Sequence, residues 1–241
     1  MRSVEKETKR VDSVKRMGIL ARAEPKTGVI DGKVIEVASP SRTNGLTADR
    51  AGISAGPYIE SFRLLALNLN RMLERIDRRS ILVVSGLPGD GRSLTALGLA
   101  RGMAEISAPV LLVDADPVGS GGSAAWERSP NPAVNGSSTR FQLDGQAGLY
   151  TYQPQAGKRA QAAFLSDVIE TLGRALSEGM TAVIDTPACL DSTVAFGLAP
   201  HVGGVVYVAR PRAGHRPPHL DIRNQLDLLG ANVLGVVVNE G

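Results

Sequence analysis

A glycine-rich segment contains the residues of this chain that are best suited to bind phosphate. It reads Gly-Leu-Pro-Gly-Asp-Gly-Arg-Ser over residues 86–93, which is the spacing G-x4-G-[K/R]-S. Glycines let backbone N–H groups turn inward around an anion, and a helix that follows directs the positive end of its dipole at the same anion. The segment therefore predicts a nucleotide-phosphate site, whose candidate contacts are Gly86, Gly89, Asp90, Gly91, Arg92, Ser93 and Leu94.

The basic residue of this segment is Arg92, at a position where such motifs normally carry lysine. Arginine keeps the positive charge, but its planar fork is longer and cannot place one compact ammonium group between the β- and γ-phosphates. Lysine is scarce in this part of the chain, because Lys158 is the only one after Lys33. Arg92 is a candidate catalytic residue, because it occupies the lysine position and keeps its charge. Two alternatives stay open: the loop binds nucleotide without ATP turnover, or it is a glycine turn with no ligand.

Acidic residues end two hydrophobic segments further along the chain. Asp114 and Asp116 follow residues 110–113, and side chains two apart on a strand share one face. Asp185 ends the second segment and precedes Thr-Pro. Carboxylates at the carboxyl edge of a parallel sheet face the ligand crevice, where they can hold Mg²⁺ or accept a proton. We expect Ser93, Asp116 and Asp185 to be metal ligands and Asp114 to be a metal-linked group or a general base.

The apolar pattern around these residues alternates between short strands and longer helices. The strand segments are continuous runs of Val, Ile and Leu, which is typical of parallel strands covered on both faces. The alternation favours an α/β architecture with helices on both sides of a mostly parallel sheet. Residues 117–148, rich in Gly, Ser, Asn and Pro, are predicted to be irregular. We predict strands over residues 80–85, 110–113, 181–185, 203–209 and 233–238, and helices over residues 58–77, 92–105, 160–178 and 220–229.

The first part of the chain differs from the rest in charge. Residues 1–50 carry 11 Lys or Arg and 7 Asp or Glu, whereas the whole chain of 241 residues carries 27 and 24. The basic excess therefore belongs to this segment, and the remainder is nearly neutral. We predict a flexible basic arm over residues 1–55 and a nucleotide-binding domain over residues 56–241. A docking helix for a partner or an anionic membrane is the alternative for the arm.

Composition excludes several classes of protein. A nucleic-acid-binding domain would be basic in its body rather than in one terminal segment. The single cysteine, Cys189, excludes an internal disulfide and a zinc site built from several thiolates, and we expect it to be a packed thiol. The apolar runs are too short to span a bilayer, and the N-terminus lacks the apolar region of a signal peptide. The chain is therefore predicted to be cytoplasmic.

Taken together, these motifs resemble the bacterial tyrosine kinase (BY-kinase) family, the cytoplasmic kinases of capsule and exopolysaccharide systems within the ParA/MinD-like P-loop ATPases. The resemblance runs over residues 57–239 and depends on the order of the motifs rather than on any one of them. It implies an α/β three-layer P-loop NTPase fold with a mostly parallel sheet. The matching segments are residues 60–69, 85–93, 114–116, 148–152, 184–187, 203–210 and 232–239. Residues 148–152 match the family's mid-domain strand, so the resemblance implies a strand there.

The resemblance also implies ligands and partners. Family members bind ATP with Mg²⁺, and in related nucleotide-binding proteins the last asparagine lies by the adenine, which here indicates Asn239. Glu60 and Arg63 match the first two positions of the family's oligomerisation motif, E-x-x-R-x-x-R, and are the candidate contacts of a homo-oligomer. The expected partner is a membrane polysaccharide co-polymerase, or chain-length determinant, which would hold a peripheral protein at the inner face of the plasma membrane.

This chain departs from the family pattern at several places. Arg92 replaces the loop lysine, and Ala66 replaces the last arginine of the oligomerisation motif, which argues against ring assembly. The family's C-terminal tyrosine cluster has no counterpart, because the four tyrosines of the chain fall on predicted strands or at a helix start. We therefore expect any phosphorylated substrate to be another chain.

The motifs leave three functions open. The first is a protein-tyrosine kinase of polysaccharide biosynthesis or export, in which Asp114 accepts the proton of a tyrosyl hydroxyl. The second is a pseudokinase adaptor that binds nucleotide, or only keeps the fold, and regulates the membrane co-polymerase. The third is a ParA/MinD-type positioning ATPase, against which the missing lysine and the kinase-like entry helix both count.

Overall fold

The computed structural model describes residues 33–37, 57–107, 109–117, 128–134, 139–143, 147–154, 161–211 and 219–239 of the chain. The other residues lie outside this description, and they include all of the predicted arm except residues 33–37. The prediction of a flexible arm is therefore not tested, and neither is its alternative, a docking helix.

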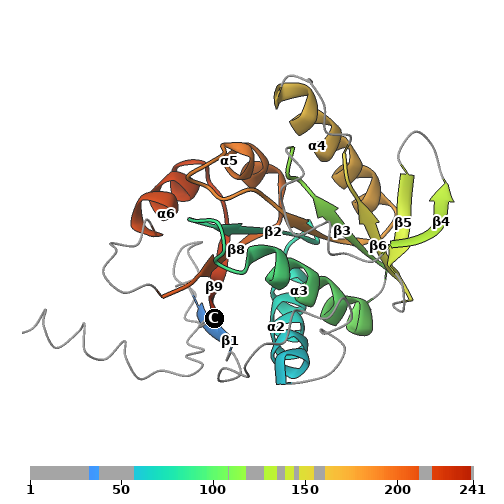
Figure 1. The fold of residues 1–241 in the computed structure, drawn as a ribbon, viewed down its shortest axis with the longest axis horizontal. Coiled ribbons are helices and arrows are strands. Elements are labelled where there is room, and N and C mark those ends of the chain that lie inside the picture. The colour runs from blue at the N-terminus through green and yellow to red at the C-terminus, as the bar shows by residue number, and fades with distance from the viewer. Residues whose placement is uncertain are drawn as a thin grey trace, which may run out of the picture.

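One sheet runs through the described part of the chain, and its centre is parallel (Figure 1). β1 (Lys33–Val37) adds a parallel strand at one edge, while β5 (Thr139–Leu143) and β4 (Arg128–Val134) add an antiparallel pair at the other. The predicted mostly parallel sheet is confirmed. Its central strands occur in the order β9 (Val233–Asn239), β8 (Gly204–Ala209), β2 (Ser80–Ser85), β7 (Thr181–Asp185), β3 (Val110–Asp114) and β6 (Leu149–Tyr152).

Two layers of helices cover the sheet, one on each face (Figure 1). The first layer consists of α2 (Pro57–Leu73) and α3 (Arg92–Ser107). The second consists of α4 (Gln161–Ser177), α5 (Val194–Leu198) with the short 3-10 turn Ala199–His201, and α6 (His219–Leu228). The predicted three-layer α/β architecture is therefore confirmed.

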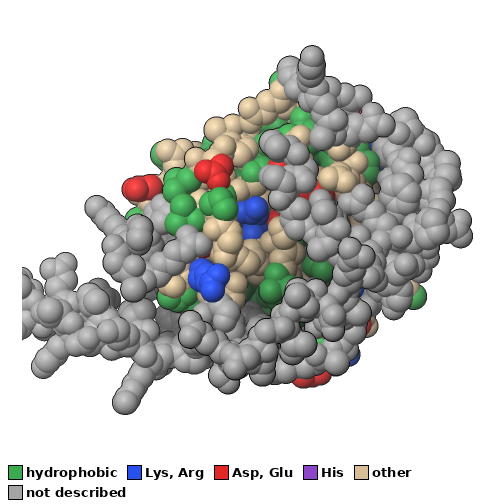
Figure 2. Space-filling model, viewed as in Figure 1, with side chains coloured by type: hydrophobic (Ala, Val, Ile, Leu, Met, Phe, Trp, Pro, Cys, Tyr) green, Lys and Arg blue, Asp and Glu red, His purple; other side chains and the backbone are tan. Residues whose placement is uncertain are grey.

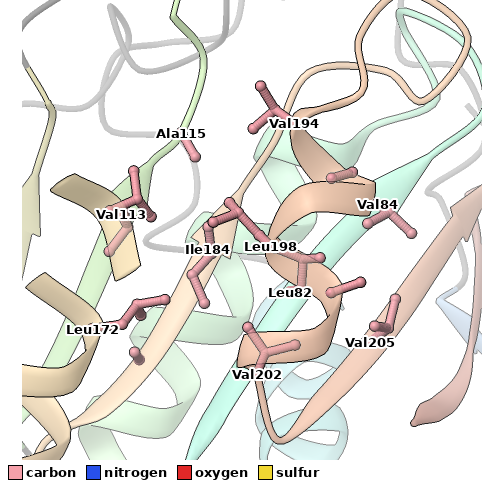
Figure 3. Close-up of a cluster of buried hydrophobic side chains, with 14 of the residues drawn as sticks. Leu82, Val84, Val113, Ala115, Leu172, Ile184, Val194, Leu198, Val202 and Val205 are labelled. Carbon is pink, nitrogen blue, oxygen red and sulfur yellow. The ribbon is translucent and has the colours of Figure 1, made fainter. Parts of the chain in front are cut away.

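The strand β2 shows why its sequence is continuously apolar. Leu82 and Val84 lie in the core below α4 and α5, which Figure 3 shows, whereas Ile81 and Val83 lie in the core below α2 and α3. All four side chains are 0% exposed. Burial of each such side chain stabilises the fold by about 1.5–3 kcal/mol, so a strand between two helix layers has no position for a polar face.

Two glycines allow α2 and α3 to approach closely. A Cβ atom at Gly98 would lie 2.4 Å from Cδ2 of Phe62, and one at Gly102 would lie 2.9 Å from the Phe62 carbonyl oxygen. The same Cβ atom at Gly102 would lie 3.0 Å from Cβ of Ala66, which is itself 0% exposed. Ala66 therefore packs between the helices, at the position where the family pattern carries arginine.

The predicted helices and strands of the domain are confirmed, with small shifts at their ends. The largest shift is at the end of α2, which stops at Leu73 instead of residue 77. There the chain tightens into three-residue turns, in which the N–H of Arg75 donates to Met72 and the N–H of Ile76 donates to Leu73. Among the described residues, no helix is long and apolar enough to cross a membrane.

Three strands were not predicted: β1, β4 and β5. The prediction of an irregular segment over residues 117–148 is therefore wrong for β4 and β5. β4 has the sequence Arg-Ser-Pro-Asn-Pro-Ala-Val, and its two prolines cannot donate to a strand ladder. Proline is tolerated at the edge of a sheet, where β4 lies, and local sequence cannot report such an edge.

Candidate phosphate-binding site

The carboxyl ends of β2, β3 and β7 meet at one edge of the sheet. Asp114 and Asp185 are direct partners in the parallel pairing of β3 with β7. The N–H of Ala115 donates to the carbonyl oxygen of Asp185 at 2.8 Å, which extends this pairing by one residue. Strand pairing thus brings together the two acidic motifs that the sequence predicts to act together.

The glycine-rich segment connects the end of β2 to the first turn of α3. Gly89 and Gly91 have φ angles of 78° and 93°, which side chains other than glycine rarely allow. The N–H of Leu87 donates to Oδ2 of Asp90 at 3.0 Å, so the aspartate side chain holds the turn from within. Because α3 begins at Arg92, the segment has the strand–loop–helix context that a phosphate-binding motif requires.

Two residues that are distant in sequence contact this loop. Asn239, at the end of β9, donates from Nδ2 to the carbonyl oxygen of Asp90 at 3.0 Å, and a Cβ atom at Gly91 would lie 2.1 Å from the same nitrogen. Arg210 directly follows β8 and donates from Nη1 to the carbonyl oxygen of Gly89 at 3.5 Å. Asn239 therefore lies beside the loop, and its contact with adenine stays a prediction. Arg210 was not predicted, although its place directly after a buried strand could have indicated it.

Arg92 contacts the ends of two strands at the sheet edge. Its Nε donates to Oδ1 of Asp185 at 3.2 Å, and its Nη1 donates to Oγ of Ser85 at 2.8 Å. The hydroxyl of Ser85 in turn donates to the carbonyl oxygen of Leu87 at 3.2 Å. The Arg92 side chain is only 12% exposed and the Asp185 side chain 3%, so this is an ion pair inside the site.

Burial governs the ionisation of Asp185. It raises the pKa of this carboxyl group to about 6, and the negative charge of Asp114 acts in the same direction. A hydrogen bond from Ser93 and the positive charge of Arg92 oppose the rise in the pKa. A carboxylate that is costly to ionise needs a cation beside it, and among the described side chains Arg92 is that cation.

Asp114 is held by two N–H donors. It is 0% exposed, its Oδ1 accepts from the N–H of Asp116 at 3.1 Å, and its Oδ2 accepts from Nε2 of Gln153 at 2.9 Å. Asp116 is 7% exposed and lies at the same edge. Gln153 was not predicted. It directly follows β6, the strand beside β3, and its position becomes informative only once that strand order is known.

The side chains at this edge fit phosphate groups better than a divalent cation. Within the described ranges, no three Asp, Glu, His or Cys side chains gather into a metal site. The predicted ligands Ser93 and Asp185 do lie together, but Asp185 accepts from Arg92. Both oxygens of Asp114 accept from N–H groups as well. A Mg²⁺ ion at this edge would therefore have to compete with Arg92 for the Asp185 carboxylate and with two N–H donors for the Asp114 carboxylate.

Other polar side chains near the loop are packed into the core. Burial raises the pKa of the Cys189 thiol to about 11, and the positive charge of Arg92 opposes this only in part. Burial also raises the pKa of Tyr207 well above its usual value. Cys189 is 7% exposed, and Tyr152 and Tyr207 are each 5% exposed. The predicted packed thiol is therefore confirmed, and these two tyrosines are buried as well.

Exposed apolar side chains border the site. Leu94, in the first turn of α3, is 41% exposed, and Leu190, after β7, is 56% exposed. The N–H of Leu190 donates to the carbonyl oxygen of Gly86 at 3.3 Å, so this part of the border is attached to the loop itself. Figure 2 shows basic, acidic and apolar side chains of the described residues adjoining one another near the middle of one face of the molecule.

The predicted oligomerisation residues form ion pairs within the chain. Nη1 of Arg63 lies 2.6 Å from Oε1 of Glu60, and its Nε lies 2.5 Å from Oε2 of Glu105 on α3. These side chains are exposed, so the pairs lie on the surface of the α2–α3 layer. A role of Glu60 and Arg63 in assembly stays a prediction.

Comparison with solved structures identifies the fold. The structure is similar to the kinase domain of the Escherichia coli tyrosine kinase ETK, with a TM-score of 0.65 and 20% identity. The match covers 83% of this chain and 82% of that chain. The chain has the fold of a bacterial tyrosine kinase domain.

The BY-kinase fold belongs to a wider P-loop ATPase fold. The cell division ATPase MinD of Pyrococcus furiosus matches 66% of this chain and 71% of its own, with a TM-score of 0.50 and 18% identity. In sequence, no family model matches. The chain is 25% identical over 203 residues, 76% of its length, to the succinoglycan biosynthesis transport protein ExoP of Rhizobium meliloti (strain 1021). It spans about a quarter of the length of that relative, 25%.

Proposed function

We propose that the chain binds a nucleotide and acts as a BY-kinase-like domain in the biosynthesis or export of exopolysaccharide. The observation that carries the proposal is the loop between β2 and α3, which lies beside Asp114, Asp185 and Asn239 at one sheet edge. The sequence similarity to ExoP supports the polysaccharide context, because the name of that protein describes succinoglycan biosynthesis and transport.

The loop would bind the phosphates of ATP through its backbone. Gly89 and Gly91 adopt the positive φ angles that turn N–H groups toward an anion, and α3 starts at the next residue with its dipole toward the same place. Asn239 would contact the base. ATP supplies a transferable phosphoryl group when bound, and the residues of this chain would bind and orient it.

Asp114 would be the general base of a kinase reaction. Hydrogen bonds from Asp116 and Gln153 fix its carboxylate, so its orientation is set before a substrate arrives. A carboxylate held in this way can accept the proton of a tyrosyl hydroxyl on another chain. Arg92 would act in catalysis by stabilising charge on the transferred phosphoryl group.

A pseudokinase adaptor is the second candidate, and one observation favours it. Arg92 is paired with Asp185 inside the site, so it does not supply the mobile ammonium group that the usual lysine places on the β- and γ-phosphates. The ParA/MinD-type alternative has less support, because the TM-score is 0.50 for MinD and 0.65 for the ETK kinase domain.

The expected partner is a membrane polysaccharide co-polymerase at the inner face of the plasma membrane. ExoP is named as a transport protein, and this chain matches a quarter of its length, 25%. The basic excess of residues 1–50 would favour an anionic membrane surface. The partner would bring the domain to the membrane as a peripheral protein.

Calorimetry with ATP and ADP tests the nucleotide site, and a phosphotyrosine assay with the membrane partner tests the reaction. Phosphotyrosine that is lost in Asp114→Asn supports the kinase. Binding without turnover, unchanged in Asp114→Asn, supports the adaptor. No binding of either nucleotide to the wild type or to Arg92→Lys would overturn both.

A further inference from the structure

We infer that the Arg92 guanidinium takes the place of both the loop lysine and the divalent cation, so that this chain binds nucleotide phosphates without Mg²⁺. The inference rests on the proposed function, because it concerns a nucleotide bound at the same loop. It also follows from the poor fit between the acidic side chains of the site and a metal ion.

The Arg92 guanidinium is held by two other side chains. It is fixed at two points, by Oδ1 of Asp185 at 3.2 Å and by Oγ of Ser85 at 2.8 Å. The Ser85 hydroxyl is itself oriented, because it donates to the carbonyl oxygen of Leu87. The guanidinium is therefore held between the end of β2, the end of β7 and the start of α3, beside the loop that would bind phosphate.

The carboxylates of the site already accept hydrogen bonds. Asp185 carries the carboxylate expected to bind the metal directly or through water, and Arg92 neutralises it at hydrogen-bond distance. Asp114, its neighbour in the sheet, directs both oxygens at the N–H groups of Asp116 and Gln153. A metal ion at this edge would have to displace an ion pair in which one side chain is 12% exposed and the other 3%.

Arg92 has more N–H donors than these two contacts use. Asp185 and Ser85 take one N–H from Nε and one from Nη1, and within the described residues the rest of the fork has no acceptor. Arginine forms short, paired hydrogen bonds with phosphate oxygens, so these N–H groups can bind phosphate while the other two stay in place. Arg92 would then bridge a carboxylate and a phosphate, as a divalent cation does.

A second arginine adds positive charge at the loop. Arg210 reaches the carbonyl oxygen of Gly89, which places a second guanidinium beside the same loop. Beyond β1 the described residues include no lysine, so among them arginines and the N-terminus of α3 are the positive groups beside the loop. Two guanidinium groups and a helix N-terminus offset the charge of a diphosphate without a metal.

The experiment measures the affinity of the full chain for ADP and for ATP by calorimetry, once with excess Mg²⁺ and once with excess EDTA. We expect the two Kd values for ADP to agree within about threefold. Arg92→Lys is the informative variant, because the compact ammonium group of lysine lacks the planar fork that contacts Asp185 and Ser85 through two different nitrogens. Its Kd in EDTA should exceed its Kd in Mg²⁺ by about tenfold or more, because the freed carboxylate can then serve a metal.

A matched control uses the same substitution at a surface pair. Nε of Arg223 lies 3.3 Å from Oδ2 of Asp227 on α6. The buried pair of Arg92 with Asp185 joins the same types of atom at nearly the same distance, 3.2 Å. Arg223→Lys should leave both Kd values unchanged. Asp185→Asn should alter the affinity equally in the two buffers, because in this account its carboxylate binds no metal.

The outcomes are distinct. Equal wild-type affinity in the two buffers, with a metal requirement appearing in Arg92→Lys, supports the inference. Wild-type binding that requires Mg²⁺ overturns it and leaves the proposed function intact. No binding in either buffer overturns both. Circular dichroism of each variant shows whether a lost affinity reflects a lost fold.

Discussion

Two regions of the molecule each carry a change at a basic position of the BY-kinase pattern: the sheet edge with the glycine-rich loop and Asp185, and the helix layer formed by α2 and α3. The two regions accommodate the change differently. At the loop, Arg92 keeps the charge and pairs with Asp185 inside the site. In the helix layer, Ala66 removes the charge and is 0% exposed against α3. Both positions make contacts within this chain.

The residues around each position explain which replacement it carries. Asp185 is a buried carboxylate whose ionisation is costly, so the position beside it still needs a cation. The neighbour of Ala66 is Gly102, and the close approach of two helices leaves no room for a longer side chain. Charge is kept where an acid requires it and lost where packing excludes it.

Restoring the family arginine by Ala66→Arg should have the largest effect. The guanidinium would lie buried between α2 and α3 without a partner. The space there is narrow, because a Cβ atom added at Gly102 would lie only 3.0 Å from Cβ of Ala66. We expect a loss of about 3–5 kcal/mol in the free energy of unfolding, or failure to fold. Urea denaturation followed by circular dichroism measures it.

The control is Ala162→Arg, at an exposed position of α4, which should change the free energy of unfolding by less than about 0.5 kcal/mol. If Ala66→Arg is as stable as the wild type and assembles into rings, the helix layer can open and the comparison with the loop fails.

The next largest effect is a pH dependence at the loop edge. Burial raises the pKa of Asp185 from 3.8 to about 6, so between these values the folded state binds a proton that the unfolded state has lost. The contribution of Asp185 to stability therefore falls as the pH rises through this window, by about 3 kcal/mol in total. Asp185→Asn should lack this fall, so its stability relative to the wild type should rise from pH 4 to pH 7.

Urea denaturation across this pH range checks the prediction. Asp227→Asn, in the exposed pair with Arg223, should follow the wild type throughout. If the wild type instead gains stability relative to Asp185→Asn as the pH rises, Arg92 stabilises the ionised carboxylate more than burial destabilises it.

A pair of glycine substitutions sharpens the description of the helix layer. Gly98→Ala would place a Cβ atom 2.4 Å from the Phe62 ring, and we expect it to lower the free energy of unfolding by about 1–3 kcal/mol. Gly173→Ala on α4 has nothing within 4 Å and should raise it by about 0.5–1 kcal/mol. Thermal denaturation of both variants shows whether the free energy of unfolding falls in the first and rises in the second. The same change in both variants would show that the α2–α3 contact is not tight.

The smallest effect is expected from Glu105→Gln, which removes the surface pair with Arg63. The two side chains are 47% and 39% exposed, and solvent screens such pairs. We expect no resolvable change in the urea midpoint and no change in the sedimentation coefficient. A clear loss of stability would show that surface charge, and not only packing, holds α2 against α3.

The central fold was predictable because its strands are apolar on both faces and its loop has a strict order of residue types. The site was predictable in part for the same reason, since Asp114 and Asp185 end such strands. Gln153 could not be predicted with the same reasoning, because it is a single polar residue whose position depends on which strands are neighbours. The place of Arg210 directly after a buried strand could have indicated this residue, but its contact with Gly89 depends on the folded loop. The contacts of Arg92 likewise depend on the folded geometry of Ser85 and Asp185.

The position of β2 in the middle of the sheet has a consequence for synthesis of the chain. Ser80 pairs with Ala182 and Ile81 pairs with Gly204, so both neighbours of β2 are translated long after it. Until then an apolar strand has two open edges, which is the form most exposed to wrong pairing. Asp185 and Asn239, which contact Arg92 and Asp90 in the folded chain, are also absent at that stage. Chaperone capture during translation is the expected result of placing the phosphate loop on a central strand.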